Sequence, residues 1–165
     1  MISYKKLTSF FGFSLHEKEF DRFLSKTFSD LTEYNILESE YIVSKNFGIE
    51  LGFTNNSAVY DDDEGVIFKS GDPIFSHFAL YPQSGQLISE LPFGVNFMEN
   101  RNKIIEKAGE PKTSKDVFVN LLNKHYLIDH YLLGDIVISF DYEVTIQTLN
   151  FIQIRRNDLV EHLKI

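Results

Sequence analysis

We predict an α+β fold in which helices pack on one face of one or more antiparallel sheets. Three observations predict it. Apolar residues recur at helical steps in some stretches, they alternate with polar residues in others, and the order of helix followed by strands occurs twice. The chain has 165 residues, of which 43% are hydrophobic, and this is enough to bury one core. We therefore expect one compact unit made of two similar halves, residues 1–82 and 83–165.

A short repeat marks the start of each half. Residues 11–17 (Phe-Gly-Phe-Ser-Leu-His-Glu) match residues 93–99 (Phe-Gly-Val-Asn-Phe-Met-Glu), 82 positions further along. In each copy a residue that commonly caps helices, Ser14 or Asn96, is followed three positions later by Glu. This capping-box pattern satisfies orphan N–H groups of a first helical turn. We therefore predict a helix beginning at Ser14 and another at Asn96.

The sequence of the first half predicts one helix followed by strands. Apolar residues after Ser14 recur in steps of three and four and predict one buried stripe, formed by Phe20, Phe23, Leu24 and Phe28. Apolar and polar residues alternate between Tyr41 and Phe53, which is typical of a strand with one buried face. Residues 65–69 and 74–81 predict further strands, with a turn at Gly71-Asp72-Pro73.

The second half predicts the same order. A helix after Asn96 carries Ile104, Ile105 and Ala108 and is stopped by Gly109 and Pro111. Three strands follow, at residues 126–133, 135–142 and 144–154, and Gly134 predicts a tight hairpin between the first two. Asn157 or Asp158 is predicted to cap a short final helix through Leu163.

The second copy of the repeat carries a family resemblance. Residues 91–111 (Leu-Pro-Phe-Gly at the start, Ala-Gly-Glu-Pro at the end) resemble the Gly-x-[Ser/Thr]-x-x-x-Val-x-x-x-x-Gly-x-Pro pattern of β-lactamase inhibitor proteins and small outer-membrane-assembly lipoproteins. The resemblance implies a helical pair on an antiparallel sheet. In the inhibitor it also implies a tandem duplication whose curved sheet grips a target enzyme. The segment departs from the pattern at Asn96, and the chain lacks the cysteines and export signal usual in such proteins.

Composition limits the chemistry that we expect. The chain has no Cys, so disulfides, thiolate zinc sites and a Cys nucleophile are excluded. It contains no Gly-x-Ser-x-Gly elbow, P-loop, dinucleotide-binding fingerprint or His-Glu-x-x-His motif. We expect a protein that is not an enzyme and needs no cofactor. The N-terminus carries no signal-peptide pattern and no stretch is apolar enough to span a bilayer, so we predict a cytoplasmic protein that does not contact membranes.

The charge pattern predicts a basic protein partner. The net charge is −8, and residues 30–64 hold nine acidic residues against the single base Lys45. Such a segment repels the phosphates of nucleic acid and attracts a cationic protein. In size and charge the chain resembles immunity proteins of bacterial toxin systems. We therefore expect a non-catalytic inhibitor of a cationic toxin, possible targets including a nuclease; the alternatives are a small-ligand or assembly module, or an enzyme with a carboxylate–His site.

The candidate site residues follow from this charge pattern and from the strand periodicity. The acids at positions 61–64 are consecutive, which is not the spacing of an EF-hand, so we expect no metal there. In the strands of the second half we predict that Ile128, His130, Ile138 and Phe140 face inward. The predicted partner-binding residues are Tyr60, Asp61, Asp62, Asp63, Glu64, Asp72, Asp129, Tyr131 and Asp141. His125 with Asp129 is the best acid–base or metal pair for an enzyme.

Overall fold

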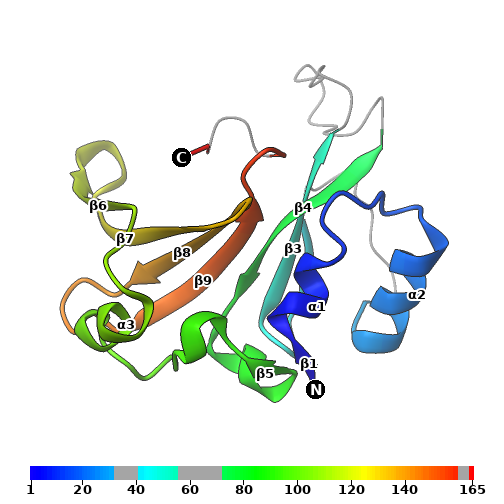
Figure 1. Ribbon diagram of the computed structural model, residues 1–165, viewed down its shortest axis with the longest axis horizontal. Coiled ribbons are helices and arrows are strands. Elements are labelled where there is room, and N and C mark those ends of the chain that lie inside the picture. The colour runs from blue at the N-terminus through cyan, green and yellow to red at the C-terminus, as the bar shows by residue number, and fades with distance from the viewer. Residues whose placement is uncertain (32–40, 56–71, 160–163) are drawn as a thin grey trace.

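The computed structural model describes residues 1–31, 41–55, 72–159 and 164–165. The described chain has an α+β architecture, with a seven-stranded antiparallel sheet and three α-helices, which confirms the predicted fold class (Figure 1). The elements are β1 (Ile2–Ser3), α1 (Tyr4–Thr8), α2 (Lys18–Thr27), β2 (Tyr41–Ser44), β3 (Ile49–Asn55), β4 (Pro73–Leu80), β5 (Ile88–Glu90), α3 (Arg101–Ala108), β6 (Thr113–Val119), β7 (Lys124–Leu133), β8 (Ile136–Tyr142) and β9 (Leu149–Arg156), with 3-10 turns η2 (Pro82–Gln86), η3 (Pro92–Gly94) and η4 (Asn120–Leu122).

One continuous sheet joins the two halves of the chain. Its strand order is β2-β3-β4-β9-β8-β7-β6, so β4 of the first half lies beside β9 of the second. Their antiparallel register pairs His77 with Arg155 and Leu80 with Ile152. A small parallel pair, β1 with β5, lies outside this sheet. β2 and β6 are its outermost described strands.

Most predicted strands are found, with three differences. The stretch from Tyr41 to Phe53 is two strands, because Gly48 adopts a positive φ of 56° and turns the chain between β2 and β3. β6 was not predicted, since Thr113–Val119 shows no apolar alternation and is exposed over almost its whole length. The last strand begins at Leu149 rather than at position 144. The predicted strand 65–69 and most of the predicted final helix lie outside the described residues.

The two repeated motifs form the same hydrogen-bonded turn, but neither begins a helix. The Ser14 amide donates to Glu17 Oε1 at 2.8 Å, and the Asn96 amide donates to Glu99 Oε2 at 2.9 Å. The Ser14 and Asn96 side chains accept from the amide two residues ahead, so each closes a local turn instead of capping a helix. α2 begins only at Lys18, and α3 begins at Arg101, where Asn100 is the cap. The predicted helix starts are therefore wrong by four or five residues.

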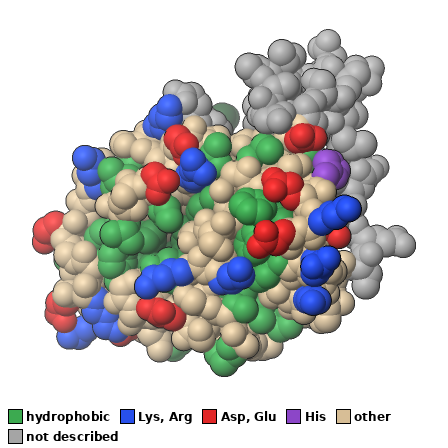
Figure 2. Space-filling view, turned by 45° about the vertical axis from the view of Figure 1, so that its right-hand side comes forward, with side chains coloured by type: hydrophobic (Ala, Val, Ile, Leu, Met, Phe, Trp, Pro, Cys, Tyr) green, Lys and Arg blue, Asp and Glu red, His purple; other side chains and the backbone are tan. Residues whose placement is uncertain are grey.

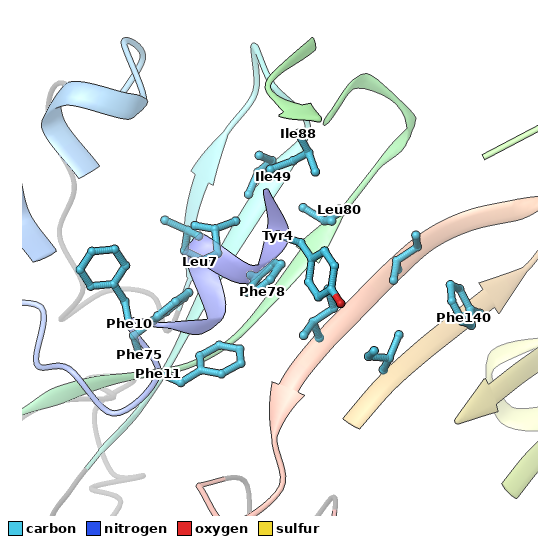
Figure 3. Close-up of a cluster of buried hydrophobic side chains, with 14 of the residues drawn as sticks. Tyr4, Leu7, Phe10, Phe11, Ile49, Phe75, Phe78, Leu80, Ile88 and Phe140 are labelled. Atoms are coloured by element: carbon cyan, nitrogen blue, oxygen red, sulfur yellow. The ribbon is translucent and has the colours of Figure 1, made fainter. Parts of the chain in front are cut away.

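An apolar core lies between the sheet and the helices. In the first half its centre is aromatic: the ring of Phe20 on α2 lies 5.2 Å from Phe10 and 5.0 Å from Phe75 on β4, measured between centroids. The same cluster continues through Leu80 and Ile154 to Phe140 on β8, so both halves share it (Figure 3). Burying each of these large side chains is worth about 1.5–3 kcal/mol.

A buried ion pair fixes α3 against this same sheet face. Arg101, the first residue of α3, donates from Nε and Nη2 to the two carboxylate oxygens of Asp129 on β7, at 2.7 and 2.8 Å. Ser114 on β6 donates to the same carboxylate at 2.6 Å. Burial acts to raise the pKa of Asp129, but the hydrogen bonds from Arg101 and Ser114 outweigh it and hold that pKa below its usual range.

Removing the arginine should therefore destabilise the fold in a pH-dependent way. We expect R101M to lower the free energy of unfolding by about 3 kcal/mol near neutral pH, because it leaves a buried carboxylate without its cation. The contribution of the pair is present above the ordinary pKa of Asp and is lost as the pH falls through the lowered pKa of folded Asp129. Urea unfolding at about pH 7 and about pH 3 should show the loss shrinking in acid.

A matched control lies on the same helix. Lys103 forms an exposed pair with Glu106 on α3, so K103M should change the free energy of unfolding little at either pH. The double variant R101M/D129L should recover much of the stability lost in R101M, because it removes the uncompensated charge. Equal losses for R101M and K103M would contradict a structural role for the buried pair.

Candidate partner-binding surface

The structure corrects the predicted face of β7, whereas Ile138 and Phe140 on β8 face the core as predicted. Asp129 pairs with Phe140 and faces the helices, where it is 0% exposed, and Tyr131 on the same face is 5% exposed. Tyr131 also donates its hydroxyl hydrogen to Gly109 O at 3.1 Å. His130 pairs with Ser139 on the opposite face. The predicted face of β7 is therefore wrong, and Asp129 and Tyr131 are structural residues packed under α3, not residues offered to a partner.

The remaining predicted contact residues lie in three places. Asp141 lies on the sheet face opposite the helices, which we call the open face. Asp72 is exposed directly before β4. Tyr60, Asp61, Asp62, Asp63 and Glu64 lie outside the described residues.

Most of the net charge of the chain lies in the segments outside the described residues. The described residues contain 15 of the 16 basic side chains and 16 of the 24 acidic ones, so this part of the protein is almost neutral. Figure 2 shows acidic and basic side chains interspersed on one face, with no block of a single sign. Two described ion pairs, Arg101–Asp129 and Lys107–Glu99, neutralise charges internally. The field of the described fold is therefore weak.

The open face carries a hollow of about 500 Å³ over β6 to β9. Its walls combine apolar, hydroxyl and charged side chains from all four strands with the last two residues of the chain. Figure 1 places the C-terminal end on the side of these strands opposite α3. The lining residues are Lys115, Lys124, Tyr126, Ile128, His130, Ser139, Asp141, Phe151, Gln153, Arg155, Lys164 and Ile165. The volume is in the range of small-molecule sites, about 300–1,000 Å³.

Three polar side chains are linked across the inner wall of this hollow. Arg155 Nη1 donates to Ser139 Oγ at 2.8 Å, and Ser139 Oγ lies 2.7 Å from His130 Nδ1. Burial, with a smaller effect from Arg155, lowers the pKa of His130, so its ring is neutral near pH 7. The neutral ring can accept the Ser139 hydroxyl hydrogen at Nδ1, while the same oxygen accepts from Arg155. These hydrogen bonds hold the three polar side chains in fixed positions at the edge of an apolar space.

Asp141 is held in the hollow at an energetic cost. Burial raises its pKa, although hydrogen bonding from Asn150 Nδ2 at 2.8 Å and the charge of Lys124 act in the opposite direction. A carboxylate kept in such a position is a common property of binding and catalytic groups. Among the predicted contact residues that the structure describes, Asp141 alone lines this cavity.

The structure does not assemble the rival acid–base pair of His125 and Asp129. The carboxylate of Asp129 is engaged by Arg101, and His125 Nε2 contacts Asp116 near the exposed end of the β6–β7 hairpin. Within the described residues there is no group of three His, Asp or Glu side chains that could hold a metal ion. Two Ser–His contacts among the described residues, Ser139–His130 and Ser76–His77, resemble a nucleophile–base pair, but both serines are almost fully buried.

The β6–β7 hairpin tip is a surface that the sequence pattern did not predict. Phe118, Leu121 and Leu122 are 51%, 93% and 61% exposed around η4. The run from Val117 to Leu122 is apolar apart from Asn120, and this composition could have indicated an apolar surface. The run lacks the alternation or helical spacing that would predict a strand or a helix. Large exposed apolar side chains at a hairpin tip are unusual in a solvated loop.

The buried position of Asp141 has a testable consequence for stability. A folded-state pKa above the unfolded value means that ionised Asp141 costs stability once the pH rises above the ordinary pKa of Asp. The variant D141N keeps an acceptor for Asn150 and removes this cost. We expect D141N to raise the free energy of unfolding at about pH 7 and to have no effect at about pH 3, measured by chemical denaturation. The exposed Glu110 is the control, and an equal pH-dependent gain in E110Q would refute the role of burial.

Comparisons with protein-family models, with curated proteins and with solved structures found no match for this chain. Among the described residues, no helix has the length and apolar character needed to cross a membrane. The function therefore has to be inferred from the charges, surfaces and cavities of the chain itself.

Proposed function

We propose that this chain is a non-catalytic binding protein that neutralises a cationic partner protein, a bacterial toxin such as a nuclease, in the manner of an immunity protein. The observation that carries the proposal is the separation of charge along the chain. The acidic and basic side chains of the described residues nearly balance each other, whereas the remaining segments contain one base and eight acids. A cationic surface would be attracted to those segments and its association accelerated.

The strand register supports a common attachment point for the largest acidic segment. The chain leaves β3 at Asn55 and re-enters β4 at Pro73, and these two residues are register partners. Residues 56–71, with Asp61 to Glu64, therefore begin and end at the same end of the sheet, where Asp72 is exposed. β2 begins toward this end, because Tyr41 pairs with Gly52. The acids of residues 33–40 directly precede it in the chain.

We also propose that the two halves arose by tandem duplication. Two observations support this. The turns at residues 11–17 and 93–99 share the Glu-to-backbone hydrogen bond and a Gly with positive φ, 93° at Gly12 and 65° at Gly94. The helices α2 and α3 follow these turns with nearly the same spacing. In the resembling β-lactamase inhibitors the duplicated sheet grips the target, so Asp141 on the open face remains a proposed contact, together with Asp72 and residues 60–64.

Neutralising the acidic run tests the electrostatic proposal. The protein and the variant D61N/D62N/D63N/E64Q would each be immobilised and used to capture proteins from lysate of the source cells at low and physiological salt. We expect a basic protein that the unaltered chain retains and that associates with the variant at least about tenfold more slowly and with a weaker salt dependence, because opposite charge raises the association rate. Its toxicity when expressed alone, and rescue of growth by co-expression of this chain, would establish inhibition.

A second variant controls for net charge. E19Q/D21N/E90Q/E110Q removes four exposed acids from the described fold, so it changes the total charge equally but leaves residues 61–64 intact. We expect this variant to bind the partner like the unaltered chain. If both variants lose binding equally, only the total charge matters. If neither does, or if the captured partner is acidic, the proposed role of the acidic run is excluded.

A further inference from the structure

Two lysines at the mouth of the open-face hollow have no acidic partner among the described residues. Lys115 on β6 and Lys124 on β7 approach the ring of Tyr126, with their Nζ atoms 5.5 and 4.8 Å from its centroid. Neither makes an ion pair with any residue that the structure describes. By contrast, Lys103 and Lys107 are neutralised by ion pairs with Glu106 and Glu99. Lys115 and Lys124 are therefore available to an anion.

The space behind these lysines is apolar on one side and polar at its inner wall. Ile128 and Phe151 contribute hydrocarbon surface, and the Phe151 ring lies 5.6 Å from that of Tyr81, which holds it in place. Ser139 and Arg155 form the inner polar wall through the hydrogen bond described above. Ile165 closes another side, because its amide and carbonyl are bound to the Asn157 side chain at 3.1 and 3.2 Å.

We propose that this hollow binds a small organic acid, one anionic group on an apolar, preferably aromatic, body. The anion lies between the ammonium groups of Lys115 and Lys124, and the body stacks against Tyr126 and enters the space over Ile128 and Phe151. Ammonium groups held over an aromatic ring at an apolar mouth are only partly hydrated, which strengthens their attraction for an anion. The volume of about 500 Å³ accommodates a ligand of two fused or linked rings.

The same geometry favours a single negative charge on the ligand. Asp141 lines the hollow within the electrostatic influence of Lys124. A monoanion can be held by the two lysines at the mouth. A second negative charge placed deeper in the hollow would be repelled by Asp141. The site differs in the charge of its ligand from the proposed cationic partner, with which it shares only Asp141, and the two lysines that define it do not depend on that proposal.

A pair of related dyes tests the proposal directly. The probes are 8-anilino-1-naphthalenesulfonate, which is a monoanion, and N-phenyl-1-naphthylamine, which has the same rings without the sulfonate. We expect the sulfonate dye to bind the folded protein saturably at one site, and the neutral dye to bind at least about tenfold more weakly. Fluorescence titration gives both affinities, and salt should weaken only the binding of the anionic dye.

Variants locate the site and decide the outcome. K115M/K124M should weaken the anionic dye at least about tenfold and leave the neutral dye unchanged. K18M/K26M, on exposed positions of α2, should bind both dyes like the unaltered chain. L121N/L122N should also retain binding, since the exposed hairpin tip is the other apolar surface a dye could use. Equal affinities for the two dyes, unchanged binding by K115M/K124M, or loss of binding in L121N/L122N alone would each overturn the proposal. Amide chemical shifts of the unaltered protein should move along β7 to β9 on titration.

Discussion

The antiparallel pairing of β4 with β9 is the constraint on which the rest of the structure depends. These two strands are the only contact through which the sheet of the first half continues into the sheet of the second, within the described residues. On one face the pairing places Phe78 beside Ile154, so the aromatic core under α1 and α2 becomes continuous with the core near α3, which includes Tyr131 and Phe140. On the other face it places His77 beside Arg155. Without it, each half would expose a strand edge and a part of the core.

The sequence predicted the class of elements better than their faces. Alternating stretches and the turn residue Gly134 predicted β4, β7 and β8, because burial and turn geometry act locally there, whereas β2 and β3 were predicted as one strand. The face of β7 could not be predicted, since both its sides carry apolar residues, Leu127 on one and Ile128 on the other. The packing of α3, and above all the Arg101–Asp129 ion pair, determines which side of β7 faces the core. The two residues of this pair lie 28 positions apart in the sequence. No local pattern reveals such a pair.

The capping-box motifs show a related limit. The sequence correctly indicated two equivalent turns at Ser14 and Asn96, and both form with the same Glu side chain bound to the backbone. The conformation of the chain after each turn is decided by tertiary contacts. Ser14 forms a β-bridge with Ile74 of β4, and this bridge keeps the chain at Ser14 extended. α3 begins only where Asn100 can accept a hydrogen bond from the Lys103 amide. The motif therefore predicts the turn that precedes each helix, but not the residue at which the helix begins.

The strand order attaches the acidic segment and the two lysines of the hollow to different strands of the sheet. The acidic segment between β3 and β4 is attached near one edge of the sheet, whereas Lys115 and Lys124 belong to β6 and β7 at the other. Four strand spacings separate β3 from β7, which is about 20 Å at roughly 4.8 Å per strand. At physiological salt the screening length is about 8 Å, so charged side chains on β3 have little effect at the lysines of β6 and β7. Asp141 belongs to both proposals, because it lines the hollow and is also a proposed contact of the cationic partner. Coupling between the two binding events should therefore arise at Asp141 or through the shared β4–β9 contact.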